Sequence, residues 1–289
     1  MQIQTVIDTI KKQYRGCYYD MDTPIDPQTT RDQILFGDPN QECTSIVVTC
    51  WANVHVIQAA IEKQANLIIC HESLFWNHGD HTTWLEDTNN GVYLQKVELL
   101  RKHNLVVWCN HDYIHSGIQT KTGYTDGIFY GLANQMGWDI GNQLGFPMTF
   151  SIPTIPLTDL VDCFLTKLPI HGARVVGNMN IQVKKNCIGF HIFGIPQDNQ
   201  LIAYIEEEGI DLVLAGETVD YTVNEYIYDA SLLHKNMALL TVGHFNIEEP
   251  GMKYMAEHMP DTLQMIPCHF VSSKDMYQYR NHTKKRMND

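Results

Sequence analysis

Histidine and carboxylate side chains follow three apolar, strand-like runs of this sequence. The runs, each with the polar residues behind it, are Asn66–Cys70 with His71 and Glu72, Leu105–Cys109 with His111, Asp112 and His115, and Met237–Val242 with His244 and Glu248. In an open α/β sheet, ligands bind outside the carboxyl ends of the strands. Imidazole nitrogens and carboxylate oxygens suit Zn, Fe and Mn ions. The sequence therefore predicts one polar crevice that binds metal at the strand ends.

Position in the chain, and not residue type alone, selects the ligands. The chain has 14 histidines, so most of them must be surface groups or hydrogen-bonding groups. Pro250 suits the first turn of a helix, so we expect a helix over 251–258 and a loop that carries the two ligands before it. The expected metal ligands are His71, Glu72, His115, His244 and Glu248.

The order of the elements predicts the fold class. A β-branched run at Ser45–Cys50, a helical pattern at Asn53–Gln64 and the run Asn66–Cys70 form a βαβ unit, which predicts a parallel, buried pair of strands. The segment Asp139–Pro156 is rich in Gly and Pro and is the best candidate for a domain boundary. The strand before His244 must reach the same crevice, so the chain is expected to return to its first domain.

We therefore expect an α/β protein with two mixed α/β domains. The metal-binding domain is discontinuous, with residues 1–140 and 237–289, and the inserted domain has residues 141–236. The metal crevice lies at the carboxyl ends of the strands.

Composition limits the partners and the location of the protein. A formal net charge of −13 argues against a nucleic-acid partner, because that binding needs clustered Lys and Arg. The eight cysteines form no CxxC motif, so we expect buried free thiols in a reducing cytosol. The sequence contains no signal-peptide pattern and no run of about 18 apolar residues. We expect a cytoplasmic protein with no membrane partner.

Two longer motifs resemble a known family. They are Asn66–Trp76, preceded by Phe36-Gly37-Asp38-Pro39, and Val242–Gly251 with its Gly-His-x-x-x-Glu pattern. Both are similar to the family of NGG-interacting factor three, whose members bind two metal ions and are often labelled GTP cyclohydrolase I type 2. Gly216-Glu217 also has a counterpart there. The resemblance extends from about Phe36 to Met259.

The resemblance implies a ligand set in which two of five positions differ. The family has a His-His pair where this chain has His71-Glu72, and an Asp where this chain has His115. Since one imidazole and one carboxylate have changed places, the set still has three His and two carboxylates. An imidazole does not normally bridge two metals, so a dinuclear centre would depend on Glu248, with Asp112 as a replacement ligand. One or two divalent ions, Zn, Fe or Mn, are expected.

The resemblance implies a metal-dependent hydrolase that acts through a metal-activated water on an unknown small molecule. Glu217 and Asp112 are candidate general acid–base groups, and Glu217 fits equally well as a carboxylate at a helix N-terminus. No glycine-rich phosphate loop supports GTP as the substrate. The alternative is a non-catalytic metal-binding or regulatory protein that forms the family's ring-shaped homohexamer. The apolar stretches Ile128–Trp138 and Tyr221–Tyr228 fit either an interface or a core.

Overall fold

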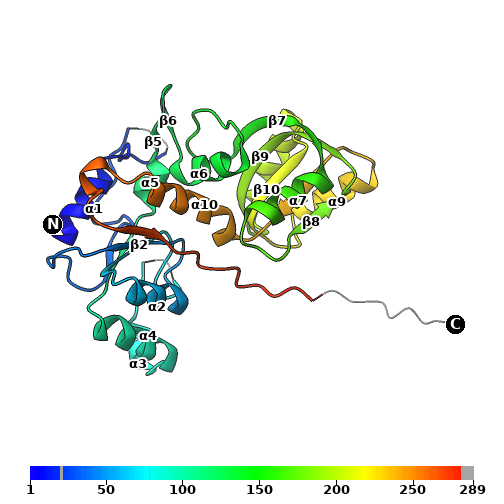
Figure 1. Cartoon of the computed structure of the whole chain (residues 1–289). Helices are drawn as coiled ribbons and strands as arrows, with labels where there is room; N and C mark the ends of the chain where they lie inside the picture. The colour runs from blue at the N-terminus through cyan, green and yellow to red at the C-terminus, as the bar shows by residue number, and fades with distance from the viewer. Residues whose placement is uncertain (20–21, 78, 281–289) are drawn as a thin grey trace.

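The molecule has two halves, and each half contains a five-stranded sheet (Figure 1). The structure is a computed structural model and describes residues 1–19, 22–77 and 79–280. The first sheet has the order β1-β4-β3-β2-β12. Its strands are β1 (Ile34–Phe36), β2 (Ile46–Val48), β3 (Leu67–Cys70), β4 (Val106–Cys109) and β12 (Cys268–Phe270). All neighbours are parallel except β1 and β4.

Helices cover both faces of the first sheet, which is why its central strands are apolar throughout. All residues of β2, β3 and β4 are buried. Helix α1 (Ile3–Lys11) packs on one face, and α2 (Val54–Glu62) and α4 (Gly91–Lys102) pack on the other. The short helix α3 (Thr83–Asp87) lies beside them. The parallel βαβ unit predicted from the sequence is confirmed as β2-α2-β3.

The second sheet repeats this three-layer plan. Its order is β7-β9-β10-β11-β8. The strands are β7 (Met148–Pro156), β8 (Arg174–Gly177), β9 (Gln182–Ile192), β10 (Leu212–Thr218) and β11 (Ala238–Thr241). Helix α7 (Leu157–Lys167) packs on one face, and α8 (Asp198–Glu208) and α9 (Val223–Leu232) pack on the other. The protein is therefore of the mixed α/β class, as predicted.

The point at which the chain returns from the second half to the first differs from the predicted one. We expected the run Met237–Val242 in the first domain, but it forms β11, which pairs with β10 and β8 in the second sheet. The chain returns to the first half through α10 (His244–Glu257), and its last strand, β12, belongs to the first sheet. We therefore propose that the return begins near Gly243 instead of at 237. Strand β7 occupies part of the Gly- and Pro-rich stretch predicted as the best candidate for a domain boundary.

Helices α6 (Gly127–Met136) and α10 cross closely between the two sheets (Figure 1). A Cβ atom added at Gly131 would lie 2.5 Å from the Cα atom of Gly251, so only glycine allows this approach. The expectation that the helix begins only after Glu248, with Pro250 in its first turn, is wrong. Helix α10 starts at His244 and contains Pro250 within it. The crossing fixes the position of α10, and with it the two predicted ligands on its first turns.

The remaining elements are short. They are α5 (Asp112–Ser116), β5 (Ile118–Gln119), β6 (Tyr124–Thr125) and the 3-10 helix Asp261–Leu263. All eight cysteines are free, and five of them are buried, as predicted. Within the described ranges, every helix is too short or too polar to cross a lipid bilayer.

Candidate metal centre

His71 and Glu72 lie where the chain leaves β3, at the carboxyl end of the first sheet. Both are buried, with 0% and 7% of their side chains exposed. The backbone N–H groups of both residues donate to the carbonyl oxygen of Cys50 in the neighbouring chain segment. The side chains of both residues reach residues of α10.

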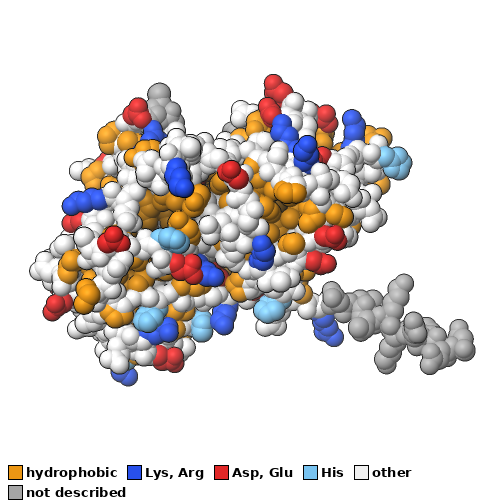
Figure 2. All heavy atoms as spheres, turned by 45° about the horizontal axis from the view of Figure 1, so that its top comes forward, with side chains coloured by type: hydrophobic (Ala, Val, Ile, Leu, Met, Phe, Trp, Pro, Cys, Tyr) orange, Lys and Arg blue, Asp and Glu red, His pale blue; other side chains and the backbone are white. Residues whose placement is uncertain are grey.

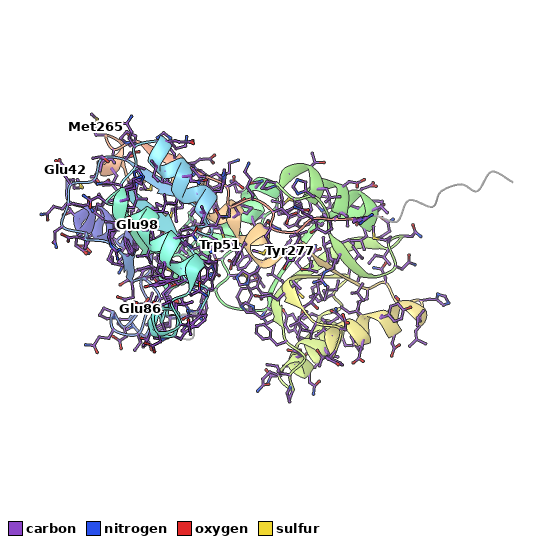
Figure 3. All side chains as sticks on the ribbon, turned by 90° about the horizontal axis from the view of Figure 1, so that it is seen from below. Glu42, Trp51, Glu86, Glu98, Met265 and Tyr277 are labelled. Atoms are coloured by element: carbon purple, nitrogen blue, oxygen red, sulfur yellow. The ribbon has the colours of Figure 1, made fainter. Side chains whose placement is uncertain are left out.

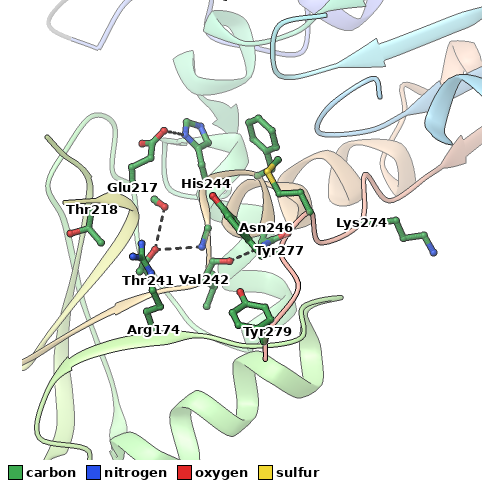
Figure 4. A pocket seen from close by; sticks show the side chains of 14 residues that line it. Arg174, Glu217, Thr218, Thr241, Val242, His244, Asn246, Lys274, Tyr277 and Tyr279 are labelled. Carbon is green, nitrogen blue, oxygen red and sulfur yellow. Dashed lines mark hydrogen bonds and ion pairs between the residues drawn. The ribbon is translucent and has the colours of Figure 1, made fainter. Parts of the chain in front are cut away.

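His244 and Glu248 lie one helical turn apart on α10 and face the same space. Gly243, just before the helix, has φ +97°, a backbone conformation that favours glycine. The Nε2 atom of His244 lies 3.0 Å from Oε1 of Glu72 and 3.1 Å from Oε2 of Glu248. The segment that follows β3 of the first sheet and the helix that follows β11 of the second sheet therefore meet at these side chains. Figure 4 shows His244 and Glu217 beside the start of α10.

Three histidines of this region share one arrangement of hydrogen bonds. The Nδ1 atom of His71 is 3.0 Å from the carbonyl oxygen of Asn110, and that of His115 is 2.7 Å from Oδ2 of Asp126. The Nδ1 atom of His244 is 2.5 Å from Oε1 of Glu217. An Nδ1–H group that donates to oxygen leaves Nε2 free as a lone-pair donor, and this is how metal-binding histidines are usually oriented.

Buried polar atoms of the cluster lack hydrogen bonds in the described part of the chain. They are His71 Nε2, Glu72 Oε1, His244 Nε2 and Glu248 Oε2, each of which lies within ion-pair distance of another member of the cluster but without hydrogen-bond geometry. Leaving such groups unpaired is costly unless something binds them. Two atoms bound tetrahedrally at about 2.0–2.1 Å from one ion lie about 3.3 Å apart, which is close to the distances found here. The residues present therefore fit a divalent metal ion.

The carboxylate of Glu248 lies between two histidines. Its Oε1 atom is 3.5 Å from Nε2 of His71, and its Oε2 atom is 3.1 Å from Nε2 of His244. Each oxygen therefore faces a different imidazole. A carboxylate in this position can bind two ions at once, one beside each histidine.

Opposite charges in this buried space shift the pKa values of its members. Burial lowers the pKa of His71, but the negative charges of Glu248 and Glu72 outweigh it and raise that pKa to about 9. Burial raises the pKa of Glu248, but His244 and His71 outweigh it and hold that pKa well below its usual range. Glu248 is thus ionised, and His71 holds a second proton. A metal ion would displace that proton on binding.

His115 lies beside His71, with ring centroids 5.0 Å apart. These two residues and His111 form one group whose ligand atoms lie within 4.8 Å of one another. His111 stacks on His71 at 4.5 Å, but Arg31 contacts its Nε2 at 2.8 Å and Asp112 contacts its Nδ1 at 3.0 Å. His111 can therefore act as a ligand through Nε2 only if its contact with Arg31 breaks.

Asp112 lies behind His111, away from the other predicted ligands. Its carboxylate accepts hydrogen bonds from the hydroxyl of Thr30 at 2.8 Å and from the backbone N–H of Arg31 at 3.0 Å. Burial raises its pKa, but the bond to His111 and the backbone bond outweigh this and lower it. The described structure places Asp112 in none of the candidate metal groups.

Glu217, at the end of β10, joins two histidines. Its Oε1 atom contacts Nδ1 of His244, and its Oε2 atom contacts Nδ1 of His191, both at 2.5 Å. Burial raises the pKa of Glu217, but the bonds to His191 and His244 outweigh it and lower that pKa to about 2. The three residues also form a candidate metal group.

Sequence reasoning missed two partners of the predicted ligands. Asp126 is fully buried and caps α6 through bonds to the N–H groups of Ile128 and Phe129. An Asp before a helical pattern is a recognisable N-cap signal. His191 lies opposite Glu217 on the parallel strands β9 and β10, and no pattern in its own segment marks it.

A cavity of about 500 Å³ adjoins this centre on the side of His244 (Figure 4). Its walls come from the ends of β10 and β11, the start of α10, β8 and the extended segment 272–280. Figure 2 shows hydrophobic side chains gathered along the hollow between the two halves of the molecule. The cluster is therefore buried on one side and open to a cavity on the other.

Comparison with known proteins gives a consistent result. The family model Duf34/NIF3 (NGG1p interacting factor 3) matches residues 23–276. A GTP cyclohydrolase 1 type 2 homolog of Clostridium perfringens is 23% identical over 252 residues, which is 84% of this chain and 87% of that protein. Another, from Clostridium acetobutylicum, is 23% identical and covers 81% of this chain and 82% of that protein.

Two solved structures have the same fold. The Bacillus cereus protein related to NIF3 superposes with a TM-score of 0.68 at 14% identity, covering 97% of this chain and 99% of that one. The Staphylococcus aureus protein SA1388 superposes with a TM-score of 0.67 at 18% identity, with the same coverage. At these identities the likeness establishes the fold.

Proposed function

The chain belongs to the Duf34/NIF3 family, and we propose that it binds one or two divalent metal ions, Zn, Fe or Mn, and hydrolyses a small molecule with their help. The proposed ligands are His71, Glu72, His115, His244 and Glu248. One observation carries the proposal: three imidazoles are held through Nδ1, and buried atoms that lack hydrogen bonds converge between them. When bound, such an ion lowers the pKa of a coordinated water from about 15.7 towards about 7 and polarises a carbonyl or phosphoryl oxygen.

The protein's own groups divide the remaining work. We assign Glu217 to positioning, because it holds the His244 ring through Nδ1 and its low pKa leaves it ionised at neutral pH. Asp112 positions His111 and the loop at Thr30 in the same way. These roles replace the general acid–base roles that the sequence suggested. The open side at His244 gives a substrate access, because 16% of its side chain is exposed.

Elemental analysis of protein purified without chelators tests metal binding. We expect one or two equivalents of a divalent ion, and a strong decrease in His244→Ala. His55→Ala is the matched control, because His55 is exposed on α2. Protein that stays metal-free after incubation with Zn, Fe and Mn salts would contradict the proposal. Turnover of phosphoesters, cyclic amides and nucleotides, including GTP, is then compared between metal-loaded and chelated protein.

A second candidate function is non-catalytic metal binding by an interaction protein. Closed coordination is typical of structural metal sites, and His71 and Glu248 are almost completely buried. Tyr221 and Tyr228, which we considered as interface residues, are 66% and 57% exposed, whereas Ile128 and Phe129 belong to the core. A homohexamer, measured by light scattering, with metal bound but no turnover of any compound class, would favour this candidate.

A further inference from the structure

The cavity beside His244 has the features of a small-molecule site. We propose that it binds an anionic compound with a flat unsaturated ring, and that this compound is the substrate presented to the metal centre. The inference rests on the proposed function and names the substrate class for it. A volume of about 500 Å³ lies within the range of about 300–1,000 Å³ for ligand pockets.

Arg174 and Lys274 are the cations that line the cavity, and Arg174 lies on its β-sheet wall. It lies on β8 directly opposite Thr241 of β11, which puts it on the wall that faces the start of α10. In the described residues, the ion pairs of Lys and Arg side chains involve Arg15, Arg101, Lys185 and Lys253, and not Arg174. Arg174 is exposed to solvent, so its guanidinium group is accessible to a ligand in the cavity. A guanidinium group matches the geometry of phosphate and carboxylate.

Tyr277 and Tyr279 form an aromatic wall. They belong to the extended segment after β12, and their exposed fractions are 56% and 41%. Burial raises the pKa of Tyr279, and the nearby cation of Arg174 opposes that rise. Exposed aromatic rings beside an arginine offer stacking surfaces to a flat ligand that also carries a negative charge.

Hydrogen bonds hold this segment in place, so the wall is not a loose tail. The carboxylate of Asp275, which is fully buried, accepts from the backbone N–H groups of His171 and Tyr277, both at 3.0 Å. The backbone N–H of Ser273 donates to Glu249 of α10 at 2.6 Å. The segment therefore connects the two halves of the molecule. Figure 3 shows Tyr277 and Trp51 at the junction between those halves.

The arrangement also sets the direction of the ligand. Figure 4 shows Glu217 and His244 at one end of the cavity, and Arg174 and Tyr279 at the other. A compound with its anionic group at Arg174 and its ring against the tyrosines would direct its remaining part towards His244. The reacting bond therefore belongs to the part of the molecule remote from the anionic group.

Calorimetric titration with phenylphosphonate, which has no hydrolysable ester bond, tests the proposal. We expect binding to metal-loaded protein that weakens about 10- to 100-fold in Arg174→Ala, because hydrogen bonds to charged groups are strong. Tyr277→Ala should weaken it about fivefold through lost stacking. Methylphosphonate, which lacks the ring, should bind more weakly, and benzyl alcohol, which lacks the charge, should not bind measurably.

Two controls separate this inference from the proposed function. Lys184→Ala, which removes an exposed cation of β9 outside the cavity, should bind phenylphosphonate like the wild type, and Arg174→Lys should be intermediate. Metal content should be unchanged in all these variants. Suppose that the protein has its full metal content. If it then fails to bind phenylphosphonate, or if Arg174→Ala binds it as tightly as the wild type does, the inference about the cavity is overturned and the proposed function is not. If the protein takes up no metal, the titration is made on metal-free protein, where Arg174-dependent binding supports the cavity and its absence overturns it.

Discussion

The two sides of the candidate centre differ in their exposure to solvent. On the inner side, His71 and His115 have 0% and 5% of their side chains exposed, and the Asp126 carboxylate behind His115 is fully buried. On the outer side, His244 is 16% exposed, and its partner Glu217 is 41% exposed. Glu248 lies between the sides and presents one oxygen to each. We infer that the inner side retains a metal ion and the outer side exchanges water and substrate.

Removing the shared carboxylate should have the largest effect. Glu248→Gln keeps the size of the side chain but removes the charge that faces both imidazoles. The loss of one partner from a buried ion pair costs about 3–5 kcal/mol, so we expect metal affinity to fall more than about 100-fold on both sides. Metal titration by calorimetry measures this. Glu257→Gln, at the exposed end of the same helix, should have no effect, and retention of one tightly bound ion in Glu248→Gln would show that the two sides are independent.

The inner side is supported by a buried lysine. Lys96 of α4 is 3% exposed, and its Nζ atom donates to the carbonyl oxygen of Leu74, in the chain segment just after Glu72. Burial lowers the pKa of Lys96 from 10.5 to about 8. Between these values the unfolded chain keeps the proton and the folded protein has lost it, so the free energy of unfolding rises with pH.

The difference between the pKa values of Lys96 in the unfolded and folded states corresponds to about 3 kcal/mol of added stability between pH 8 and pH 10.5. Urea unfolding at a series of pH values measures it, as the difference between wild type and Lys96→Met. Lys102→Met, at the exposed end of the same helix, should track the wild type. Identical pH profiles for Lys96→Met and the wild type would show that Lys96 is hydrated and that the inner side is less dry than we infer.

The exchange of an imidazole and a carboxylate between the sides can be reversed. Glu72→His and His115→Asp each restore one residue of the family pattern, and the double variant restores both. Each single variant keeps five ligands but changes their charge, to four His and one carboxylate in Glu72→His and to two His and three carboxylates in His115→Asp, so we expect weaker metal binding in both. The double variant should regain affinity with a coupling free energy of about 2 kcal/mol, which is typical of contacting residues. Metal titration of the four proteins gives the coupling, and strictly additive losses would show that positions 72 and 115 do not form one ligand set.

The sequence predicted the strands and their ends well, because buried parallel strands are short apolar runs with a polar residue at the end. The pairing of β2 with β3, and the position of His71 and Glu72 after β3, follow from that pattern alone. The start of α10 could not be predicted in the same way. Pro250 disfavours a helix locally, and the tertiary crossing of Gly251 with α6 outweighs it.

The hydrogen-bond partners of the ligands were the least predictable part of the site. Glu217 was noted as a carboxylate after a strand, but its contacts with His191 and His244 depend on which strands are neighbours in the second sheet. The same holds for β11: the sequence predicted the strand itself but could not show which sheet it joins. Local patterns specify elements, whereas long-range packing decides what their ends face.

The carboxylates behind the histidines provide the finest test of the two sides. Asp126→Asn and Glu217→Gln each remove the charge and one of two acceptor oxygens, and the oxygen that remains can still accept from His115 or from His244. Substitutions of such partners typically reduce metal affinity about 10- to 100-fold. Because the Asp126 carboxylate is fully buried and that of Glu217 is 41% exposed, we expect about 100-fold for Asp126→Asn and about 10-fold for Glu217→Gln. Competition titrations with a chromophoric chelator resolve a tenfold difference, and equal losses would mean that solvent screens both sides alike.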